Sequence, residues 1–308
     1  MNPNHITLGH LAQFSLRTIS SQFHLTRAFG RPYVFQVELT NFCNLKCPMC
    51  PHDLMTRPVG YMDFGLFQEI VAQLKSTNPD LRLHNMGESL FHREIGTFIR
   101  HANETGLETI LSTNATMLTE AKIQELIDAR LSWLYVSFDG AAADTYERFR
   151  KGARYEREKA KVESLLRTRG SQGSRYPKVM MSCLSLPGTR AETEEFRAYW
   201  TARVDAVRIK RADGWDGSSD RINEIVADFQ YAVGRSVCGW PWQSVVVLWD
   251  GRVVPCCFDF DGKYVLGDLR QKSLAEIFND EPMQELRRLL RERRASEVNL
   301  CRTCPRGQ

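Results

Sequence analysis

Apolar runs of strand length alternate with amphipathic helical patterns over the first two thirds of the chain. The apolar runs are Tyr33 to Leu39, Leu81 to Asn85, Glu108 to Ser112, Trp133 to Phe138, Lys178 to Leu184 and Ala206 to Ile209. The helical patterns are Phe64 to Leu74, Ile95 to Glu104, Ala121 to Ala129, Tyr155 to Thr168 and Thr193 to Arg203. Strands joined by helices of this length make right-handed crossovers and pair in parallel. Six units are fewer than the roughly eight that close a full barrel, so the pattern predicts an α/β fold, a partial (β/α)6 barrel.

The alternation stops after Asp213, and residues 214–220 are rich in Gly, Ser and Asp, as in a linker loop. The turn dipeptide Asp250-Gly251 then separates two short apolar runs, which predicts a β-hairpin. Helical segments follow near 273–278 and 282–294, and a loosely helical rhythm precedes the barrel. We therefore expect an N-terminal helical extension packed across the main domain (1–32), a barrel (33–213) and a small hairpin-and-helix module (214–308).

The bulk properties exclude some classes of protein. The chain has 308 residues, of which 43% are hydrophobic, and a formal net charge of +4. An arginine-rich stretch contributes much of that charge and is expected to be a solvated helix face rather than a nucleic-acid site; it holds Arg287, Arg288, Arg291, Arg293 and Arg294. No run approaches the about 18 apolar residues of a membrane span, and no signal peptide is evident. We expect a cytoplasmic protein whose cysteines bind metal.

Three cysteines, Cys43, Cys47 and Cys50, lie on a short segment that directly follows the first strand. Thiolates at this spacing can bind three irons of a [4Fe-4S] cube and leave the fourth iron without a protein ligand. Structural zinc sites usually pair two Cys-x-x-Cys elements and close all four positions, so this spacing is a poor zinc signature. An iron–sulfur cluster is the favoured interpretation, with zinc or structural cysteines as the alternatives.

This segment resembles the CX3CX2C signature of radical S-adenosylmethionine (SAM) enzymes. In that family the methionine amine and carboxylate of SAM bind the open iron, and SAM is cleaved to a 5′-deoxyadenosyl radical that takes a hydrogen atom from the substrate. The resemblance covers about residues 33 to 210 and implies that a donor such as flavodoxin or ferredoxin supplies the electron. The protein supplies orientation and excludes water.

By the same resemblance, residues after successive strands line the SAM site, because ligands bind at the carboxyl ends of parallel strands. Met86-Gly87-Glu88-Ser89 is similar to a Gly-Gly-Glu-Pro motif whose Glu receives the SAM amine, with Met86 and Ser89 departing from it. Thr113-Asn114-Ala115 is similar to Thr-Asn-Gly, and Ser137-Phe138-Asp139-Gly140 to Ser-Ile-Asp-Gly. Taken singly, each motif is also a turn or a helix cap. The expected cofactor-binding residues are Met49, Gly87, Glu88, Asn114, Ser137, Asp139 and Ser182.

Five further cysteines follow the barrel: Cys238, Cys256, Cys257, Cys301 and Cys304. A cysteine, a hairpin with Gly251 before Cys256, and a distant Cys-x-x-Cys together resemble the shortened SPASM (twitch) module, which binds one auxiliary [4Fe-4S] cluster. The resemblance implies that Cys238, Cys256, Cys301 and Cys304 are the ligands, and a structural zinc site is the alternative. Cys183, late in the fifth strand, is expected to be a buried core thiol.

The two-cluster pattern resembles the scyllo-inosamine dehydrogenase type of radical SAM alcohol oxidase in aminoglycoside antibiotic pathways, where a second cluster can accept the substrate's second electron. Radical SAM epimerases are similar too, and they use a cysteine outside the clusters as hydrogen donor. Adjacent strand residues face opposite sides, so Cys257 is the candidate donor. Peptide maturases and a non-catalytic electron carrier are further alternatives, the former disfavoured because only about thirty residues precede the barrel.

The substrate expected from this resemblance is a small amino sugar or cyclitol. Charged residues near the barrel mouth and the auxiliary cysteines are candidates for binding its hydroxyl and ammonium groups, and solvated loop charges are the alternative. They are Lys210, Arg211, Asp213, Asp216, Asp259 and Asp261.

Overall fold

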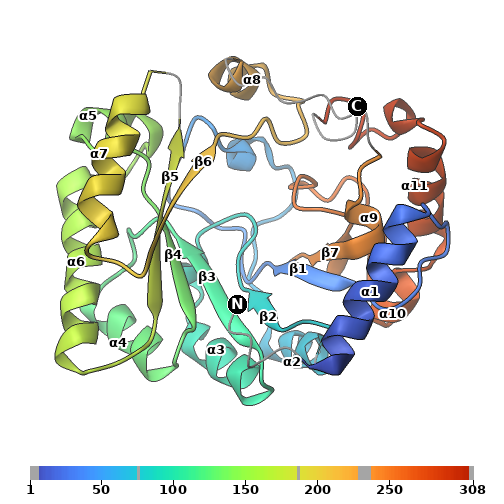
Figure 1. The fold of residues 1–308 in the computed structure, drawn as a ribbon, viewed down its shortest axis with the longest axis horizontal. Helices are drawn as coiled ribbons and strands as arrows, with labels where there is room; N and C mark the ends of the chain where they lie inside the picture. The colour runs from blue at the N-terminus through green and yellow to red at the C-terminus, as the bar shows by residue number, and fades with distance from the viewer. Residues whose placement is uncertain (1–6, 75–76, 186–187, 228–236, 305–308) are drawn as a thin grey trace.

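Five parallel strands form the larger of two sheets in the computed structural model of the chain, which describes residues 7–74, 77–185, 188–227 and 237–304 (Figure 1). They lie in chain order and are β2 (Asp80–Arg82), β3 (Glu108–Thr113), β4 (Trp133–Ser137), β5 (Lys178–Ser185) and β6 (Ala206–Arg211). The connecting helices are α2 (Phe64–Leu74), α3 (Ile95–Glu104), α4 (Glu120–Asp128), α5 (Ala143–Phe149), α6 (Tyr155–Ser171) and α7 (Arg190–Thr201). Helices α4, α6 and α7 cover the outer face of the sheet in Figure 1. The predicted partial barrel is confirmed.

The first barrel strand, β1 (Tyr33–Val37), hydrogen-bonds into a second sheet of order β1-β7-β8-β9. It pairs in parallel with β7 (Ser244–Val247), which forms the predicted hairpin with β8 (Arg252–Val254); β9 is Gly267–Asp268. The C-terminal module is therefore joined to the barrel by a β-ladder. The domain limits at 32/33 and 213/214 stay a prediction.

A side-chain amide fills the break between β1 and β2. Asn78 accepts a hydrogen bond from the Val34 backbone N–H at 3.1 Å and donates one to the Val34 carbonyl at 2.8 Å. It therefore offers the edge of β1 the same donor and acceptor as a strand residue. Because buried backbone groups must be paired, Asn78 lets β1 turn away from the five-stranded sheet without leaving its edge unsatisfied.

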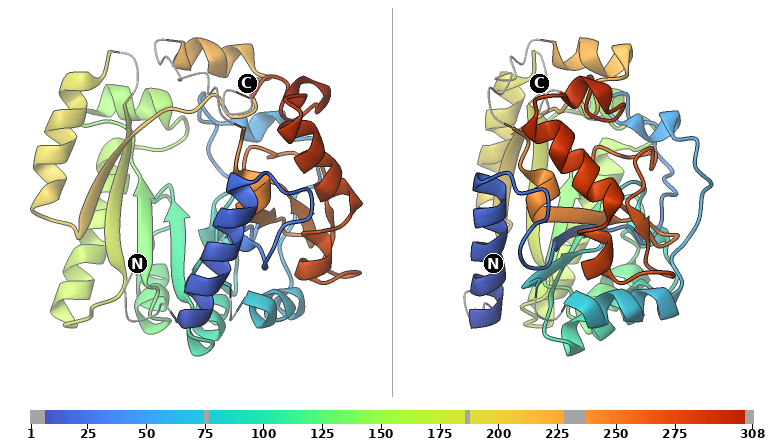
Figure 2. Two further views of the ribbon diagram at one scale, coloured as in Figure 1. Left: turned by 45° about the vertical axis from the view of Figure 1, so that its right-hand side comes forward. Right: turned by 90° about the vertical axis from the view of Figure 1, so that its right-hand side faces the viewer.

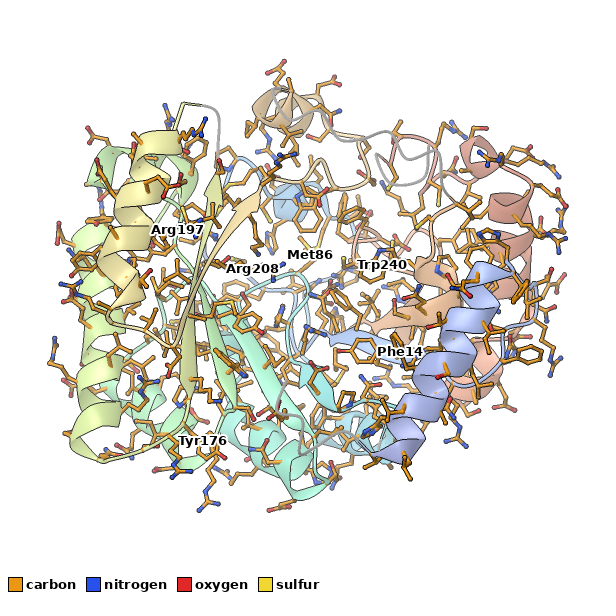
Figure 3. The ribbon with its side chains drawn as sticks, viewed as in Figure 1. Phe14, Met86, Tyr176, Arg197, Arg208 and Trp240 are labelled. Carbon is orange, nitrogen blue, oxygen red and sulfur yellow. The ribbon has the colours of Figure 1, made fainter. Side chains whose placement is uncertain are left out.

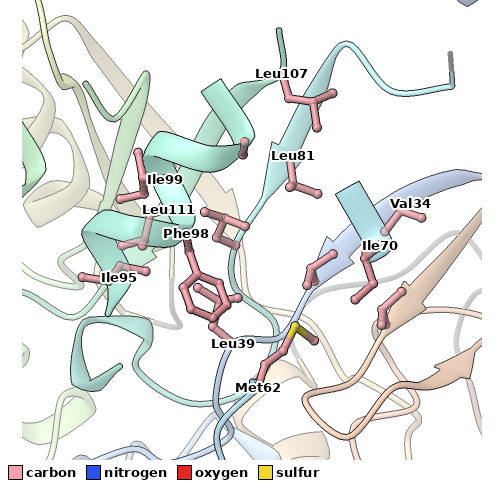
Figure 4. Close-up of a cluster of buried hydrophobic side chains, with 14 of the residues drawn as sticks. Val34, Leu39, Met62, Ile70, Leu81, Ile95, Phe98, Ile99, Leu107 and Leu111 are labelled. Atoms are coloured by element: carbon pink, nitrogen blue, oxygen red, sulfur yellow. The ribbon is translucent and has the colours of Figure 1, made fainter. Parts of the chain in front are cut away.

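The core between β1, β2 and the helices is apolar, as Figure 4 shows for side chains that include Val34, Leu81 and Phe98. In α3 the buried residues Ile95, Phe98, Ile99 and Ala102 recur every three or four positions, which places them on one helix face. Each fully buried large side chain stabilises the fold by about 1.5–3 kcal/mol. This core fixes the strand ends from which the loops of the site extend.

The N-terminal helix α1 (Leu8–Gln22) begins at a capping box between Thr7 and His10. It lies beside α9 (Trp240–Gln243) of the C-terminal module (Figures 1 and 2). Trp242 donates from Nε1 to the Leu25 carbonyl at 2.7 Å. The N-terminal extension thus reaches the C-terminal module as well as the barrel. Among the described residues, no helix is long and apolar enough to cross a membrane.

The C-terminal helices are α8 (Asp220–Val226), α10 (Leu274–Ile277) and α11 (Glu281–Arg291). The prediction that the arginines of α11 form a solvated face is wrong for Arg287, which is fully buried. Its guanidinium donates to the carbonyls of Pro241 and Thr26 and to Asn279 Oδ1, at 2.9–3.1 Å. These acceptors come from distant segments of the chain, so helical spacing alone could not reveal them. Arg291 and Arg293 are exposed, as predicted.

Candidate active site

A cavity of about 400 Å³ lies at the carboxyl ends of the barrel strands. Its wall holds the three loop cysteines and every expected SAM-side residue: Met49, Gly87, Glu88, Asn114, Ser137, Asp139 and Ser182. In Figure 3, Met86 lies at the centre of the molecule, between the two sheets. The structure therefore brings together residues from the ends of five strands, β1 to β5.

The thiols of Cys43, Cys47 and Cys50 face this cavity from one tight loop, in which the Cys50 N–H donates to the Cys47 carbonyl at 3.0 Å. Burial raises the pKa of the Cys43 thiol to about 11 and that of Cys50 to about 12. Thiolates are thus unfavourable here unless a metal centre stabilises them.

The donor set fits an iron–sulfur cluster better than a single ion. Within residues 7–74, 77–185, 188–227 and 237–304, no three Cys, His, Asp or Glu side chains converge on a single metal position. A cluster, by contrast, carries its cysteines apart on separate irons. His52 also lines the cavity, but its Nε2 is hydrogen-bonded to the Asn41 carbonyl at 2.7 Å. Three thiolates are therefore the ligands that this loop offers.

Gly87 permits the close approach of two loops at the cavity wall. Its φ is +85°, and a Cβ at this position would lie 2.6 Å from the Thr40 carbonyl oxygen. The neighbouring Glu88 N–H donates to the Phe42 carbonyl at 2.7 Å. Only glycine tolerates both the conformation and the contact, whereas Met86 and Ser89, which depart from the family motif, meet no such restriction.

Glu88 presents a buried carboxylate to the cavity. It accepts hydrogen bonds from the Asn114 N–H at 2.6 Å and the Thr113 hydroxyl at 2.8 Å. Burial raises its pKa to about 7, although these hydrogen bonds act in the opposite direction. A cationic or amine ligand in the cavity would stabilise the ionised form.

Two other residues that were expected at the SAM site, Asn114 and Asp139, make contacts with other protein side chains. Asn114 Nδ2 lies 3.8 Å from Cys43 Sγ and so reaches the cysteine loop. Asp139 forms an ion pair with Arg150 at 2.5 Å and accepts from the Leu184 N–H at 2.7 Å. Arg150 Nη1 lies 4.0 Å from Cys47 Sγ, so Asp139 positions a cation beside a cysteine that the motif implies is a ligand.

Sequence reasoning missed Arg150 and His84, which both line the cavity. Arg150 follows α5, a helix that was not predicted, and nothing in its local sequence marks it. His84 follows β2 directly, and its position after a strand was an available signal. Burial lowers the pKa of His84 to about 3, helped by Arg82 and Lys210, so its imidazole is neutral near pH 7.

A second, apolar cavity collects the five C-terminal cysteines, Cys238, Cys256, Cys257, Cys301 and Cys304, beside leucines of α11. Burial raises the pKa of the Cys301 thiol to about 12 and that of Cys256 well above its usual range. As in the first loop, only metal binding makes thiolates favourable there. The five thiols supply the four ligands of a closed cluster and one more. Cys257 and Phe258 line both cavities.

The charged candidates near the barrel mouth divide into two groups. Lys210, Arg211 and Asp213 line the main cavity. Asp261 instead accepts from the backbone of Thr56 and Arg57 at 2.6 and 3.1 Å. Asp259 and Asp216 likewise bind backbone N–H groups of their own turns. These three aspartates hold loops together, and Cys183 is buried in the core as expected.

Two protein families match this chain. The radical SAM superfamily matches residues 37–171, and the SPASM iron–sulfur cluster-binding domain matches residues 238–305. The first domain implies a [4Fe-4S] cluster with SAM, and the second implies an auxiliary iron–sulfur cluster. Both cysteine sets described above fit these groups in number and placement.

Similar curated proteins cover most of the chain. The tungsten-containing aldehyde ferredoxin oxidoreductase cofactor-modifying protein of Pyrococcus furiosus is 26% identical, over 80% of each chain. The PqqA peptide cyclase of Bradyrhizobium diazoefficiens is 24% identical, over 77% of this chain and 70% of its own. The S-adenosyl-L-methionine-dependent 2-deoxy-scyllo-inosamine dehydrogenase of Niallia circulans is 23% identical, over 88% and 92%.

The fold is also that of a solved structure, BtrN in complex with AdoMet and 2-DOIA. That structure is 20% identical, has a TM-score of 0.59, and the match covers 89% of this chain and 94% of BtrN. The likeness supports the arrangement of partial barrel and C-terminal module. Together with the two family matches and the two cysteine sets, it shows that the chain is a radical SAM enzyme with a C-terminal SPASM-type iron–sulfur domain.

Proposed function

We propose that this enzyme oxidises an alcohol carbon of a small amino sugar or cyclitol to a ketone, in the biosynthesis of a natural product such as an antibiotic. The observation that carries the proposal is the wall formed by Cys257 and Phe258, which separates the main cavity from the cavity of the C-terminal cysteines. The two cavities therefore share part of their lining, which places the proposed auxiliary cluster next to the proposed substrate site. The similarity to an inosamine dehydrogenase, at 23% identity over 88% of this chain, supports the same reaction class.

In this proposal Cys43, Cys47 and Cys50 hold the SAM-binding cluster, and Cys238, Cys256, Cys301 and Cys304 hold the auxiliary cluster. When bound, the first cluster and SAM together supply hydrogen-atom abstraction from carbon, started by an electron from a partner such as flavodoxin or ferredoxin. Binding, orientation and the exclusion of water are the roles of the protein's own side chains.

The residues of the cavity bind and orient these groups. Glu88 receives the amine of SAM, because its buried carboxylate lacks a cationic partner in the contacts around it. Arg150 offsets the negative charge of the thiolates from beside Cys47. Met49, buried against Phe149 and Ala212, excludes water from one side. Gly87, Asn114, Ser137, Asp139 and Ser182 complete the proposed SAM-side wall.

The affinity for SAM should depend on pH through Glu88. Its pKa of about 7 means that the carboxylate is mostly protonated at pH 6 and mostly ionised at pH 8. Only the ionised form binds an amine well, so affinity should rise with pH, by about tenfold from this group alone. Calorimetry on reconstituted protein measures it. The Glu88→Gln variant cannot titrate at this position, so its affinity for SAM should change with pH only as far as SAM itself titrates. If the affinity of the variant changes with pH as much as that of the wild type, Glu88 does not bind the SAM amine.

Mass spectrometry in D2O tests the reaction. The protein, reconstituted anaerobically with SAM and a reductant, is incubated with 2-deoxy-scyllo-inosamine and related cyclitols. A dehydrogenase product is about two mass units lighter than the substrate, because two hydrogens leave as the hydroxyl becomes a ketone. An isomer of unchanged connectivity carrying one deuterium would contradict dehydrogenation.

That second outcome defines the alternative function, a radical SAM epimerase. The observation in its favour is that Cys257, which lies outside the proposed ligand set, lines the main cavity. A thiol there could return a solvent-derived hydrogen atom to the substrate carbon. The Cys257→Ala variant separates the two, since it should leave a dehydrogenase largely active and stop an epimerase.

A further inference from the structure

We propose that the cationic residues of β6, Arg208, Lys210 and Arg211, bind an anionic group of the substrate, a phosphate or a carboxylate, in the main cavity. This inference rests on the proposed function, which requires a substrate with a hydroxyl group that is oxidised. It adds that the same substrate also carries a negatively charged group.

The strand register places these side chains at the site. Lys210 and Arg211 line the cavity itself. In the ladder between β5 and β6, Ser182 is opposite Arg208 and Leu184 is opposite Lys210, and both of these β5 residues line the same cavity. Figure 3 shows Arg208 on the side of β6 that is turned toward Met86. Since alternate strand residues share a face, Arg208 lies on the same face of β6 as Lys210, next to the cavity lining.

Three other arginines of the barrel have anionic partners. Arg57 binds Glu38 at 2.6 Å, Arg150 binds Asp139 at 2.5 Å, and Arg82 lies 3.5 Å from Asp80. Within the parts of the chain that the structure describes, the side chains of Arg208, Lys210 and Arg211 make no hydrogen bond or ion pair. All three side chains are exposed, and Lys210 and Arg211 border the cavity, so their charges are open to an anionic ligand that enters it.

The local charge balance points the same way. Protein surrounding Lys210 lowers its pKa, and neighbouring Arg208 lowers it further, while Asp139 acts in the opposite direction. Asp213 lines the cavity beside Lys210 and Arg211, and Asp139, in the same lining, is paired with Arg150. Glu88 lies in the same wall and is assigned to SAM. A bound anion would therefore relieve repulsion among the β6 cations.

His84 supplies an acceptor for a hydroxyl next to this site. It lines the cavity, its ring is hydrogen-bonded to the Ile110 backbone, and its buried Nδ1 has no hydrogen-bond partner. A neutral imidazole that donates to a carbonyl through one nitrogen keeps the other as an acceptor. Lys210 is near enough to affect the pKa of His84. The pair thus fits a ligand that offers a hydroxyl and an anion side by side.

Binding measurements test the inference without turnover. The reconstituted holoenzyme with SAM is titrated calorimetrically with glucosamine 6-phosphate, glucuronate and glucosamine. We expect at least one of the anions to bind about tenfold or more tightly than glucosamine, because an anion can form charge-assisted hydrogen bonds with Lys210 and Arg211 that glucosamine cannot make. The preference should vanish in Lys210→Met and persist in Lys178→Met, a lysine over the Trp133 ring at the opposite end of β5. A gain for one anion alone identifies the group as phosphate or carboxylate.

Two results would overturn the inference. One is equal binding of all three probes by the wild-type protein. The other is loss of substrate-independent 5′-deoxyadenosine formation in Lys210→Met, which would assign Lys210 to SAM instead. The proposed dehydrogenation fails separately, when no cyclitol or sugar yields a product about two mass units lighter although the anion preference is present.

Discussion

Replacing Cys43, Cys47 and Cys50 together by alanine is expected to abolish 5′-deoxyadenosine formation and to halve the iron content. The wild-type chain should bind about eight irons after anaerobic reconstitution, in two [4Fe-4S] clusters, and the variant about four. All three thiols lie in the main cavity, and the C-terminal thiols lie in another, so the auxiliary cluster should survive. Iron and sulfide analysis with chromatography of the nucleoside products measures both effects.

Cys183→Ala is the matched control for this variant. Cys183 is the remaining cysteine of the barrel strands, and it is buried in the core outside the main cavity wall. Its loss removes a thiol without removing a proposed ligand, so about eight irons and SAM cleavage should remain. Undiminished SAM cleavage in the triple variant would overturn the assignment of the first cluster.

Replacing Arg57 by methionine is expected to destabilise the protein by about 3–5 kcal/mol, because it leaves the buried Glu38 carboxylate without its cation. The pair is bidentate, with both distances 2.6 Å, and both side chains are almost completely buried. Arg57 also donates to the Phe260 carbonyl at 2.8 Å. This one side chain therefore ties the segment after the cysteine loop to the barrel and to the C-terminal module. Urea unfolding under anaerobic conditions measures the loss.

Two comparison variants isolate the buried charge. Pairing Glu38→Gln with Arg57→Met removes the uncompensated carboxylate and should recover part of the stability. Arg154→Met breaks an exposed ion pair with Glu147, which water and salt screen, so it should cost little stability. A loss in Arg57→Met no larger than in Arg154→Met would show that the Glu38 pair does not hold these segments together.

The sequence was sufficient to predict the barrel strands because each is an apolar run between helical patterns, and all six are present near the predicted positions. It could not predict that β1 hydrogen-bonds to β7 instead of β2. That choice depends on Asn78, whose side chain satisfies the open edge of β1. A side chain that replaces the hydrogen bonds of a strand produces no periodic pattern in the sequence, so this contact could be found only in the structure.

The site was predictable where local chemistry restricts the residue. Gly87 has a positive φ and a backbone contact that no other residue allows, and the thiols have a fixed spacing. Arg150 and the buried Arg287 were not predictable, since their partners lie on other segments of the chain and no local pattern marks the pairing. Asp259 and Asp261 had the right charge for ligand binding, but they bind loop backbone. Charge alone does not distinguish these roles.

The central claim is that the cluster of Cys43, Cys47 and Cys50 binds SAM in the main cavity through its one iron without a protein ligand. Electron–nuclear double resonance on the reduced protein with 15N-amine SAM tests it most directly. We predict a hyperfine coupling between this cluster and the labelled nitrogen, present in the wild type and absent in the triple alanine variant. A reduced cluster of these cysteines that shows no coupling to SAM would contradict the account.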